Sequence, residues 1–169
     1  MERKNTMSKY YRVYADINLD MIAANVDELM SQTAEGTKAI AVVKADGYGH
    51  GDVAVSKAVY DRVAGYAVAT LDEAVNLREN GIDKPILILG FVNTDEYRIL
   101  VENEVSATVF DYETAKMLNE VAGQLGKKAR CHIKVDTGMR RIGLEPDESG
   151  VETVKTVSYT HLRAHETRH

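Results

Sequence analysis

The feature that most constrains the fold is a regular alternation of short apolar runs with helix-type patterns. Strands are expected at residues 39–44, 66–69, 86–89, 107–110 and 130–135. Helical patterns lie between them and begin at Asp52, Thr70, Asn93 and Asp111. Strands that are apolar throughout and separated by single helices form parallel sheets. The pattern therefore predicts an α/β fold with a parallel sheet that is covered on both sides.

Two architectures fit this alternation, a doubly wound open sheet and a (β/α)8 barrel. In the last strand, period-two alternation places His132, Lys134 and Asp136 on one face. An open sheet would bury these side chains beneath helices at considerable cost in free energy, whereas a barrel can direct Lys134 toward a polar site. The pattern therefore favours a barrel. A complete barrel takes about 250 residues, so this chain of 169 residues predicts a partial TIM-type barrel with about five of the eight β/α units.

The two ends of the chain do not follow the alternation. Residues 1–10 are expected to form a disordered lead-in, and residues 11–156 the barrel domain. Within it, residues 11–19 alternate weakly, which predicts a strand, and Asp20 is expected to cap the helix that follows. The segment 157–169 continues neither pattern and is expected to be an aberrant, disordered tail.

Two histidines in that tail, His161 and His165, have the i, i+4 spacing of a metal-binding pair on a helix. No glutamate follows the first of them, so the metalloprotease pattern is not present. No metal site is therefore predicted for this chain.

The composition argues against several classes of function. A net charge of −5 provides no basic surface for nucleic acid or for an anionic membrane. The single cysteine, Cys131, cannot form an internal disulfide, which is typical of a reducing compartment. The N-terminus lacks the apolar core of a signal peptide, and no run approaches the ~20 apolar residues of a membrane helix. We expect a soluble, cytoplasmic protein without nucleic-acid or membrane partners.

Lys44 is the first candidate for chemistry because it ends an apolar strand. Sites in parallel α/β folds form where the strands end, and a desolvated lysine there can act as a base or form a Schiff base. The alternative is that its amine reaches out to water, and position alone favours this alternative. Gly47, Gly49 and Gly51 match neither the dinucleotide fingerprint nor the P-loop, and indicate only a close approach or a sharp turn of the backbone.

Two stretches carry a resemblance to a known family. The sequence AVVKADGYGHG at residues 41–51, followed by KVDTGMRRIG at residues 134–143, is similar to the paired motifs of alanine racemases, which are fold-type III pyridoxal phosphate enzymes. The stretch YADINLDMIAANV at residues 14–26 also resembles the N-terminal opening of that family. The resemblance covers roughly residues 11–144.

The resemblance implies roles for four residues. Lys44 would form the internal aldimine with pyridoxal 5'-phosphate and act as the base on one face of the substrate, and Tyr48 would reach the cofactor phosphate. Arg141 would lie near the phenolic oxygen of the cofactor and the substrate carboxylate. Lys134 matches a lysine that is carbamylated in many members. Two cations converging in a low-dielectric site are costly, and carbamylation would make Lys134 an anion that can pair with Arg141.

Other residues in the motifs receive lesser roles. Arg140 stands at a variable position and is assigned none, and His50 is expected to have a structural role in its loop. Cys131 is expected to be a small buried filler.

The resemblance also implies a reaction, the interconversion of L-alanine and D-alanine, which supplies D-alanine for peptidoglycan. Lys44 would handle the proton on one face of Cα, and a tyrosine from the C-terminal β-domain of the second subunit of a homodimer would handle the other. The sequence ends before such a domain, so this chain is expected to be a truncated and inactive form.

Three alternatives remain open from the sequence. The first is a barrel-only protein of pyridoxal phosphate homeostasis, which keeps the lysine but has no racemase activity. The second is a fragment without a function of its own. The third is a Rossmann-type nucleotide binder, against which the missing glycine fingerprint argues.

Overall fold

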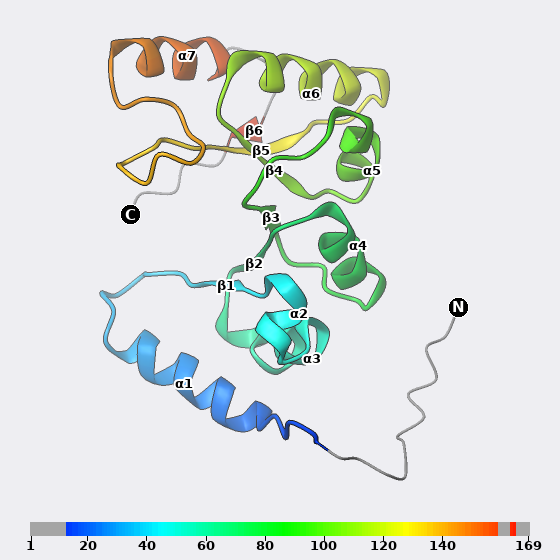
Figure 1. The fold of residues 1–169 in the computed structure, drawn as a ribbon, viewed down its shortest axis with the longest axis vertical. Coiled ribbons are helices and arrows are strands. Elements are labelled where there is room, and N and C mark those ends of the chain that lie inside the picture. The colour runs from blue at the N-terminus through cyan, green and yellow to red at the C-terminus, as the bar shows by residue number, and fades with distance from the viewer. Residues whose placement is uncertain (1–12, 159–162, 165–169) are drawn as a thin grey trace.

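Over the residues that the structure describes, 13–158 and 163–164, the fold is built around a six-stranded parallel sheet (Figure 1). In this computed structural model the strands are β1 (Ile40–Val42), β2 (Gly65–Val68), β3 (Ile86–Ile88), β4 (Ser106–Val109), β5 (Arg130–Ile133) and β6 (Arg163–Ala164). The α-helices are α1 (Leu19–Ser31), α2 (Lys44–Gly49), α3 (Asp52–Ala58), α4 (Leu71–Glu79), α5 (Tyr97–Glu102), α6 (Tyr112–Gln124) and α7 (Glu148–Ser158). Short 3-10 turns are η1 (Tyr60–Arg62) and η2 (Thr94–Glu96).

The strands lie in the sheet in the order in which they occur along the chain, and every neighbouring pair is parallel. A doubly wound sheet reverses its strand order at a switch point, and the described sheet has no such reversal. Successive β/α units of a barrel add their strands in this sequential way. The predicted partial-barrel architecture is therefore confirmed, and the Rossmann alternative is wrong.

Helices cover one face of the sheet. Because β–α–β connections are right-handed, strands added in sequence carry their helices on the same face, and Figure 1 shows α4 and α5 on one side of β2 to β4. The core lies on this side, where Tyr66 and Cys131 are almost fully buried. On the other face, Ile40 and Val42 are each 42% exposed. In a complete barrel, side chains from the strands themselves fill the interior and cover this second face.

Several helix starts agree with the sequence. Thr70 caps α4 in a capping box with Glu73, and the Asp111 side chain accepts a hydrogen bond of 2.7 Å from the Thr114 N–H at the start of α6. These caps connect residues three positions apart, so they can be identified from the sequence alone.

The N-terminal part differs from the prediction. Helix α1 begins at Leu19, and its cap is Asn18, whose side chain accepts a hydrogen bond of 3.0 Å from the Met21 N–H. Asp20 instead lies in the first turn, where a negative charge stabilises the helix dipole. Residues 13–18 form no strand, so the strand expected at 11–19 is wrong over its described part. The lead-in expected at residues 1–10 lies outside the described residues.

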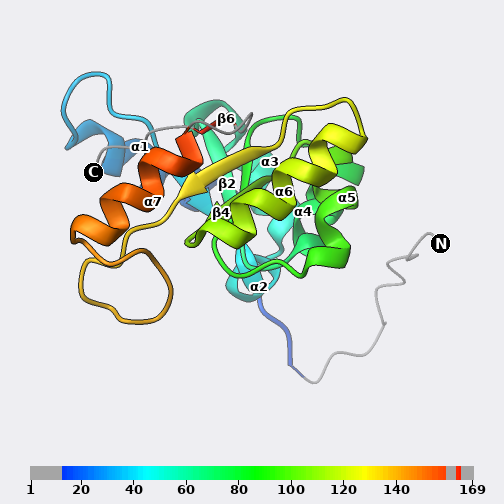
Figure 2. The ribbon, with the colours of Figure 1, turned by 90° about the horizontal axis from the view of Figure 1, so that it is seen from above.

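The C-terminal part has more regular structure than expected. Helix α7 follows a loop and is not among the predicted helices. The Asp147 side chain accepts a hydrogen bond of 3.0 Å from the Gly150 N–H at its start, and Val157 near its end is 1% exposed. Figures 1 and 2 show α7 beside α6. Helix α7 and strand β6 thus extend into the segment expected to be disordered, whose other residues lie outside the described part of the chain.

Among the helices formed by described residues, none has the length and apolar character needed to cross a lipid bilayer.

Candidate functional site

Lys44 lies at the C-terminal edge of the sheet, just after β1. The Val43 N–H donates a hydrogen bond of 2.9 Å to the Ala67 carbonyl, and this bond extends the pairing of β1 with β2 by one residue. Strand β1 itself ends at Val42, so the predicted strand 39–44 is too long and Lys44 opens α2 instead. The lysine nevertheless occupies the edge at which barrel enzymes place their active sites.

The backbone after Lys44 makes an unusual left-handed turn. Four successive residues have positive φ angles: Ala45 (52°), Asp46 (53°), Gly47 (60°) and Tyr48 (56°). A non-glycine residue in this region costs about 1–2 kcal/mol. Gly47 is buried, and a Cβ there would lie 3.2 Å from the Asp52 nitrogen, so both its φ and its packing favour glycine. Such strained segments persist only when the surrounding structure holds them.

Helix α4 and the start of α3 hold this turn from outside. The Glu73 Oε1 atom accepts a hydrogen bond of 2.8 Å from the Ala45 N–H. Within the turn, the Asp46 Oδ1 atom accepts one of 3.1 Å from the Asp52 N–H at the start of α3. The Asn76 side chain donates a hydrogen bond of 2.9 Å to the Asp52 carboxylate. The turn is therefore held directly by Glu73, which is distant from it in sequence, and by the start of α3, which Asn76 contacts.

The turn brings Tyr48 to Lys44. The Lys44 Nζ atom lies 5.8 Å from the centroid of the Tyr48 ring, within the range of a cation–π interaction. Tyr48 is 60% exposed, and Lys44 is half-buried. A lysine amine and a phenol hydroxyl are thus presented together to solvent at the sheet edge.

His50 closes the turn. Its Nδ1 lies 3.1 Å from the Gly47 carbonyl and 3.2 Å from the Tyr48 carbonyl. Because a carbonyl oxygen can only accept, Nδ1 carries the proton and donates it in these contacts. This geometry agrees with the structural loop role expected for His50.

The second motif forms a loop that leaves β5 at the same edge of the sheet. The Lys134 N–H donates to the Val109 carbonyl at 2.8 Å, and the Leu144 N–H donates to the Lys134 carbonyl at 2.8 Å. The chain therefore leaves the sheet after Lys134 and returns beside it at Leu144. Gly143 makes this return possible, because a Cβ there would lie 2.5 Å from the Asp136 nitrogen.

Asp136 organises the turn inside this loop. Its Oδ1 atom accepts hydrogen bonds from the Arg140 N–H at 3.0 Å and the Gly138 N–H at 2.8 Å. These two bonds, with that from Arg140 contributing most, hold the pKa of the Asp136 carboxyl below its ordinary value. Arg140 has a φ of 53°, so its backbone has a structural part in the turn.

The structure places the predicted site residues along one edge but does not join all of them. Lys44 follows β1 and Lys134 follows β5, with β2, β3 and β4 between them. Arg141 is exposed in the loop after β5. Across the described chain, no hydrogen bond or ion pair links the side chains of Lys134 and Arg141. The pairing expected between Arg141 and a carbamylated Lys134 stays a prediction.

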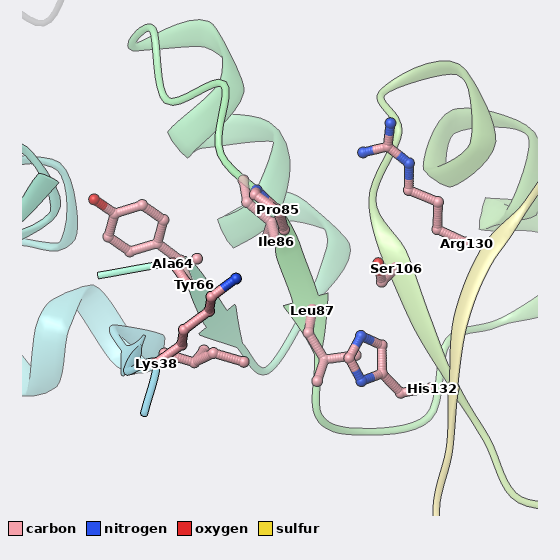
Figure 3. Close-up of a pocket in the computed structure, with 11 residues that line it drawn as sticks. Lys38, Ala64, Tyr66, Pro85, Ile86, Leu87, Ser106, Arg130 and His132 are labelled. Atoms are coloured by element: carbon pink, nitrogen blue, oxygen red, sulfur yellow. The ribbon is translucent and has the colours of Figure 1, made fainter. Parts of the chain in front are cut away.

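A cavity of about 260 Å³ lies at the opposite, N-terminal end of the strands (Figure 3). Its lining includes Lys38, Leu87, Arg130 and His132. His132 thus faces the side of β5 away from the helices, whereas Cys131 is buried in the core, as the alternation predicts. The N-terminal face of a barrel serves stability rather than catalysis, so this cavity is not the candidate site.

Glu73 and Asn76 are supporting residues of the site that sequence reasoning did not find. Glu73 carries a recognisable sequence signal as the last residue of a capping box. That signal shows why Glu73 helps to start α4, but it does not show the second contact with Ala45, which lies 28 residues earlier in the chain.

Comparison with known proteins identifies a family for this chain. The family model described as "Alanine racemase, N-terminal domain" matches residues 17–164. An alanine racemase of Methanococcus maripaludis is 43% identical over 146 residues, which are 86% of this chain and 39% of that protein. One of Clostridium perfringens is 45% identical over 143 residues, which are 84% of this chain and 37% of that protein.

Solved structures agree with the sequence comparison. The alanine racemase of Clostridium difficile 630 superimposes with a TM-score of 0.81 at 38% identity, and the match covers 87% of this chain and 38% of that one. A second structure of that enzyme is a complex with cycloserine. The chain thus spans about two fifths of the length of the relatives it matches.

Proposed function

Because the chain belongs to the alanine racemase N-terminal domain family, we propose that it supplies the lysine-bearing part of a pyridoxal-phosphate-dependent alanine racemase. The observation that carries this proposal is the position of Lys44. Its amine stands at the C-terminal edge of a parallel sheet, on a strained turn and beside an exposed tyrosine. The substrate would be alanine, and the product D-alanine would enter peptidoglycan.

The donor set fits the proposed cofactor. Pyridoxal phosphate carries an aldehyde, a phosphate and a phenolic oxygen. The site edge carries a lysine amine, a tyrosine hydroxyl and further cationic side chains at Lys134 and Arg141. An amine is the group that condenses with an aldehyde, and hydroxyl and guanidinium groups bind phosphate and carboxylate oxygens.

When bound, pyridoxal phosphate supplies an aldehyde for Lys44 and a ring that withdraws electrons from the substrate Cα. Tyr48 would donate a hydrogen bond to the phosphate. Arg141 would bind the phenolic oxygen and the substrate carboxylate. Lys44 would remove or return the proton on one face of Cα.

Lys134 would serve as a carbamylated residue. In its neutral form the amine can add to carbon dioxide and release a proton, which leaves an anionic carbamate. A carbamate at Lys134 could form charge-assisted hydrogen bonds with Arg141, whereas two cations would repel each other.

A racemase needs a second group on the opposite face of Cα. We propose that it comes from the part of the longer relatives that lies outside their match to this chain, across a homodimer interface in a cytoplasmic enzyme. The chain by itself is therefore expected to form no D-alanine, because Lys44 can exchange a proton on one face only. An assay that detects D-alanine production by the chain would contradict the proposal that the second catalytic group comes from outside it.

Chemical trapping tests the cofactor proposal directly. The chain would be incubated with pyridoxal phosphate and reduced with borohydride, and labelled peptides would be identified by mass spectrometry. Label is expected at Lys44 and is expected to disappear in Lys44→Arg. The exposed Lys57 in the same sample reports non-specific labelling. Equal labelling of Lys44 and Lys57 would contradict the proposal.

A further inference from the structure

The carboxylate of Glu73 has two tasks. Its Oε2 atom accepts hydrogen bonds from the Ala69 N–H at 2.7 Å and the Thr70 N–H at 3.3 Å, which completes the start of α4. Its Oε1 atom accepts the bond of 2.8 Å from the Ala45 N–H. We propose that Glu73 is a positioning residue for Lys44, an inference that rests on the proposed role of that lysine.

The peptide group explains how Glu73 can act on Lys44. The Ala45 N–H belongs to the peptide bond that joins Lys44 to Ala45. Because a peptide is planar, a hydrogen bond to this N–H restrains the plane and with it the ψ angle of Lys44. That angle helps to set the direction in which the lysine side chain leaves the backbone. Glu73 thus acts on the amine through the backbone and without touching it.

Asn76 lies three residues after Glu73 in α4 and contacts the segment that follows the turn. It donates a hydrogen bond to the buried Asp52 carboxylate, and the Asp52 N–H donates to the Asp46 side chain. Residues three apart lie on the same face of a helix. One face of α4 therefore holds the start of the turn at Ala45 through Glu73 and the start of α3 at Asp52 through Asn76.

The chemistry of the contact requires a carboxylate. An ionised glutamate has two oxygens that only accept, and here each faces backbone N–H groups. In Glu73→Gln one oxygen becomes an NH₂ group that only donates. Whichever way the amide turns, it places a donor against the Ala45 N–H or against the cap N–H groups. Glu73→Gln therefore removes at least one of these hydrogen bonds, although the side chain keeps nearly the same size.

The sequence offers a matched control. Glu96 closes the capping box before α5, where its Oε2 atom accepts a hydrogen bond of 3.0 Å from the Asn93 N–H. In the described structure, Glu96 makes no hydrogen bond to the turn that carries Lys44. Glu96→Gln thus makes the same chemical change at a capping glutamate that lacks the additional contact.

Competition between lysines tests the inference. The rate of reductive labelling of Lys44 by pyridoxal phosphate, divided by that of Lys57 in the same sample, would be measured for both variants across a pH series. In Glu73→Gln this ratio is expected to fall about tenfold, because small displacements of a reacting group have large effects on rate. In Glu96→Gln it is expected to change less than about twofold. A Glu73→Gln ratio that matches the wild type would overturn the inference.

Hydrogen exchange covers the cases in which labelling is uninformative. The Ala45 amide of the wild-type chain is expected to be protected, and Glu73→Gln is expected to speed its exchange selectively if the variant folds. A fast-exchanging Ala45 amide in the wild-type chain would overturn the inference even if Glu73→Gln does not fold. A wild-type chain that takes no label at Lys44 but protects Ala45 would overturn the proposed function and leave the contact with Glu73 standing.

Discussion

Helix α4 contacts the backbone at both ends of the sheet, through an acidic side chain at one end and a basic side chain at the other. Toward the C-terminal end, Glu73 accepts hydrogen bonds from backbone N–H groups around Lys44. Toward the N-terminal end, Arg78 donates to four backbone carbonyls, those of Ile82, Lys84, Asn103 and Glu104, at 2.7 to 3.2 Å. An acidic side chain thus organises the edge with the candidate site, and a basic side chain organises the opposite edge.

The backbone conformation also differs between these two ends. Near Arg78, Glu104 is a single left-handed residue directly after the last turn of α5, a common way for a helix to end. Near Glu73, the left-handed stretch runs over four successive residues, from Ala45 to Tyr48. The comparison teaches that one end is built for stability, whereas the other stores backbone strain in the turn that presents Lys44.

The largest expected effect is at the stable end. Arg78→Ala removes all four hydrogen bonds between the guanidinium and backbone carbonyls, so we expect the free energy of unfolding to fall by about 3 kcal/mol. Urea denaturation followed by circular dichroism measures this change. Arg98→Ala is the control, because it removes only an exposed ion pair with Glu102 and is expected to cost less than about 1 kcal/mol. Equal losses of unfolding free energy in the two variants would show that the hydrogen bonds of Arg78 contribute no more to stability than an exposed ion pair.

A smaller effect of opposite sign is expected at the strained end. Ala45→Gly relieves the steric conflict at a φ of 52°, so the free energy of unfolding is expected to rise by up to about 1 kcal/mol. The same denaturation experiment measures it. Ala54→Gly, in the exposed part of α3, is the control and is expected to lower stability by about 1 kcal/mol. If both substitutions destabilise alike, the turn after Lys44 is not strained.

The smallest effect is local and depends on pH. The backbone N–H groups of Arg140 and Gly138 lower the pKa of Asp136 in the folded chain. A group with a depressed folded pKa stabilises the fold above its unfolded pKa, and that contribution is lost as the pH falls through the folded value. We therefore expect the protection factors of the Arg140 and Gly138 amides, measured by NMR as exchange relative to the intrinsic rate at the same pH, to fall at acidic pH. Asp136→Asn should remove this pH dependence, and its persistence in that variant would exclude Asp136 as the cause.

The core between the two ends contains the buried Cys131. Burial raises the pKa of the Cys131 thiol to about 11, so little reactive thiolate exists at neutral pH. This agrees with the interpretation of Cys131 as a buried filler.

The sequence by itself determined the features that depend on neighbours along the chain. Apolar runs of strand length identified β1 to β5, and the Thr70 and Asp111 caps marked two helix starts, because these signals connect residues only a few positions apart. The motifs around Lys44 and Lys134 also indicated the family, because each motif is a run of consecutive residues.

Only the tertiary structure decided the features that depend on residues distant in sequence. It ended β1 before Lys44, left one face of β1 without helices, and showed where α7 begins and ends. It also showed the left-handed turn and the bond from the Ala45 N–H to Glu73. No local pattern specifies that bond, because it exists only once α4 has packed beside the turn. The physical reason is that a strained turn takes its stability from partners that folding brings to it.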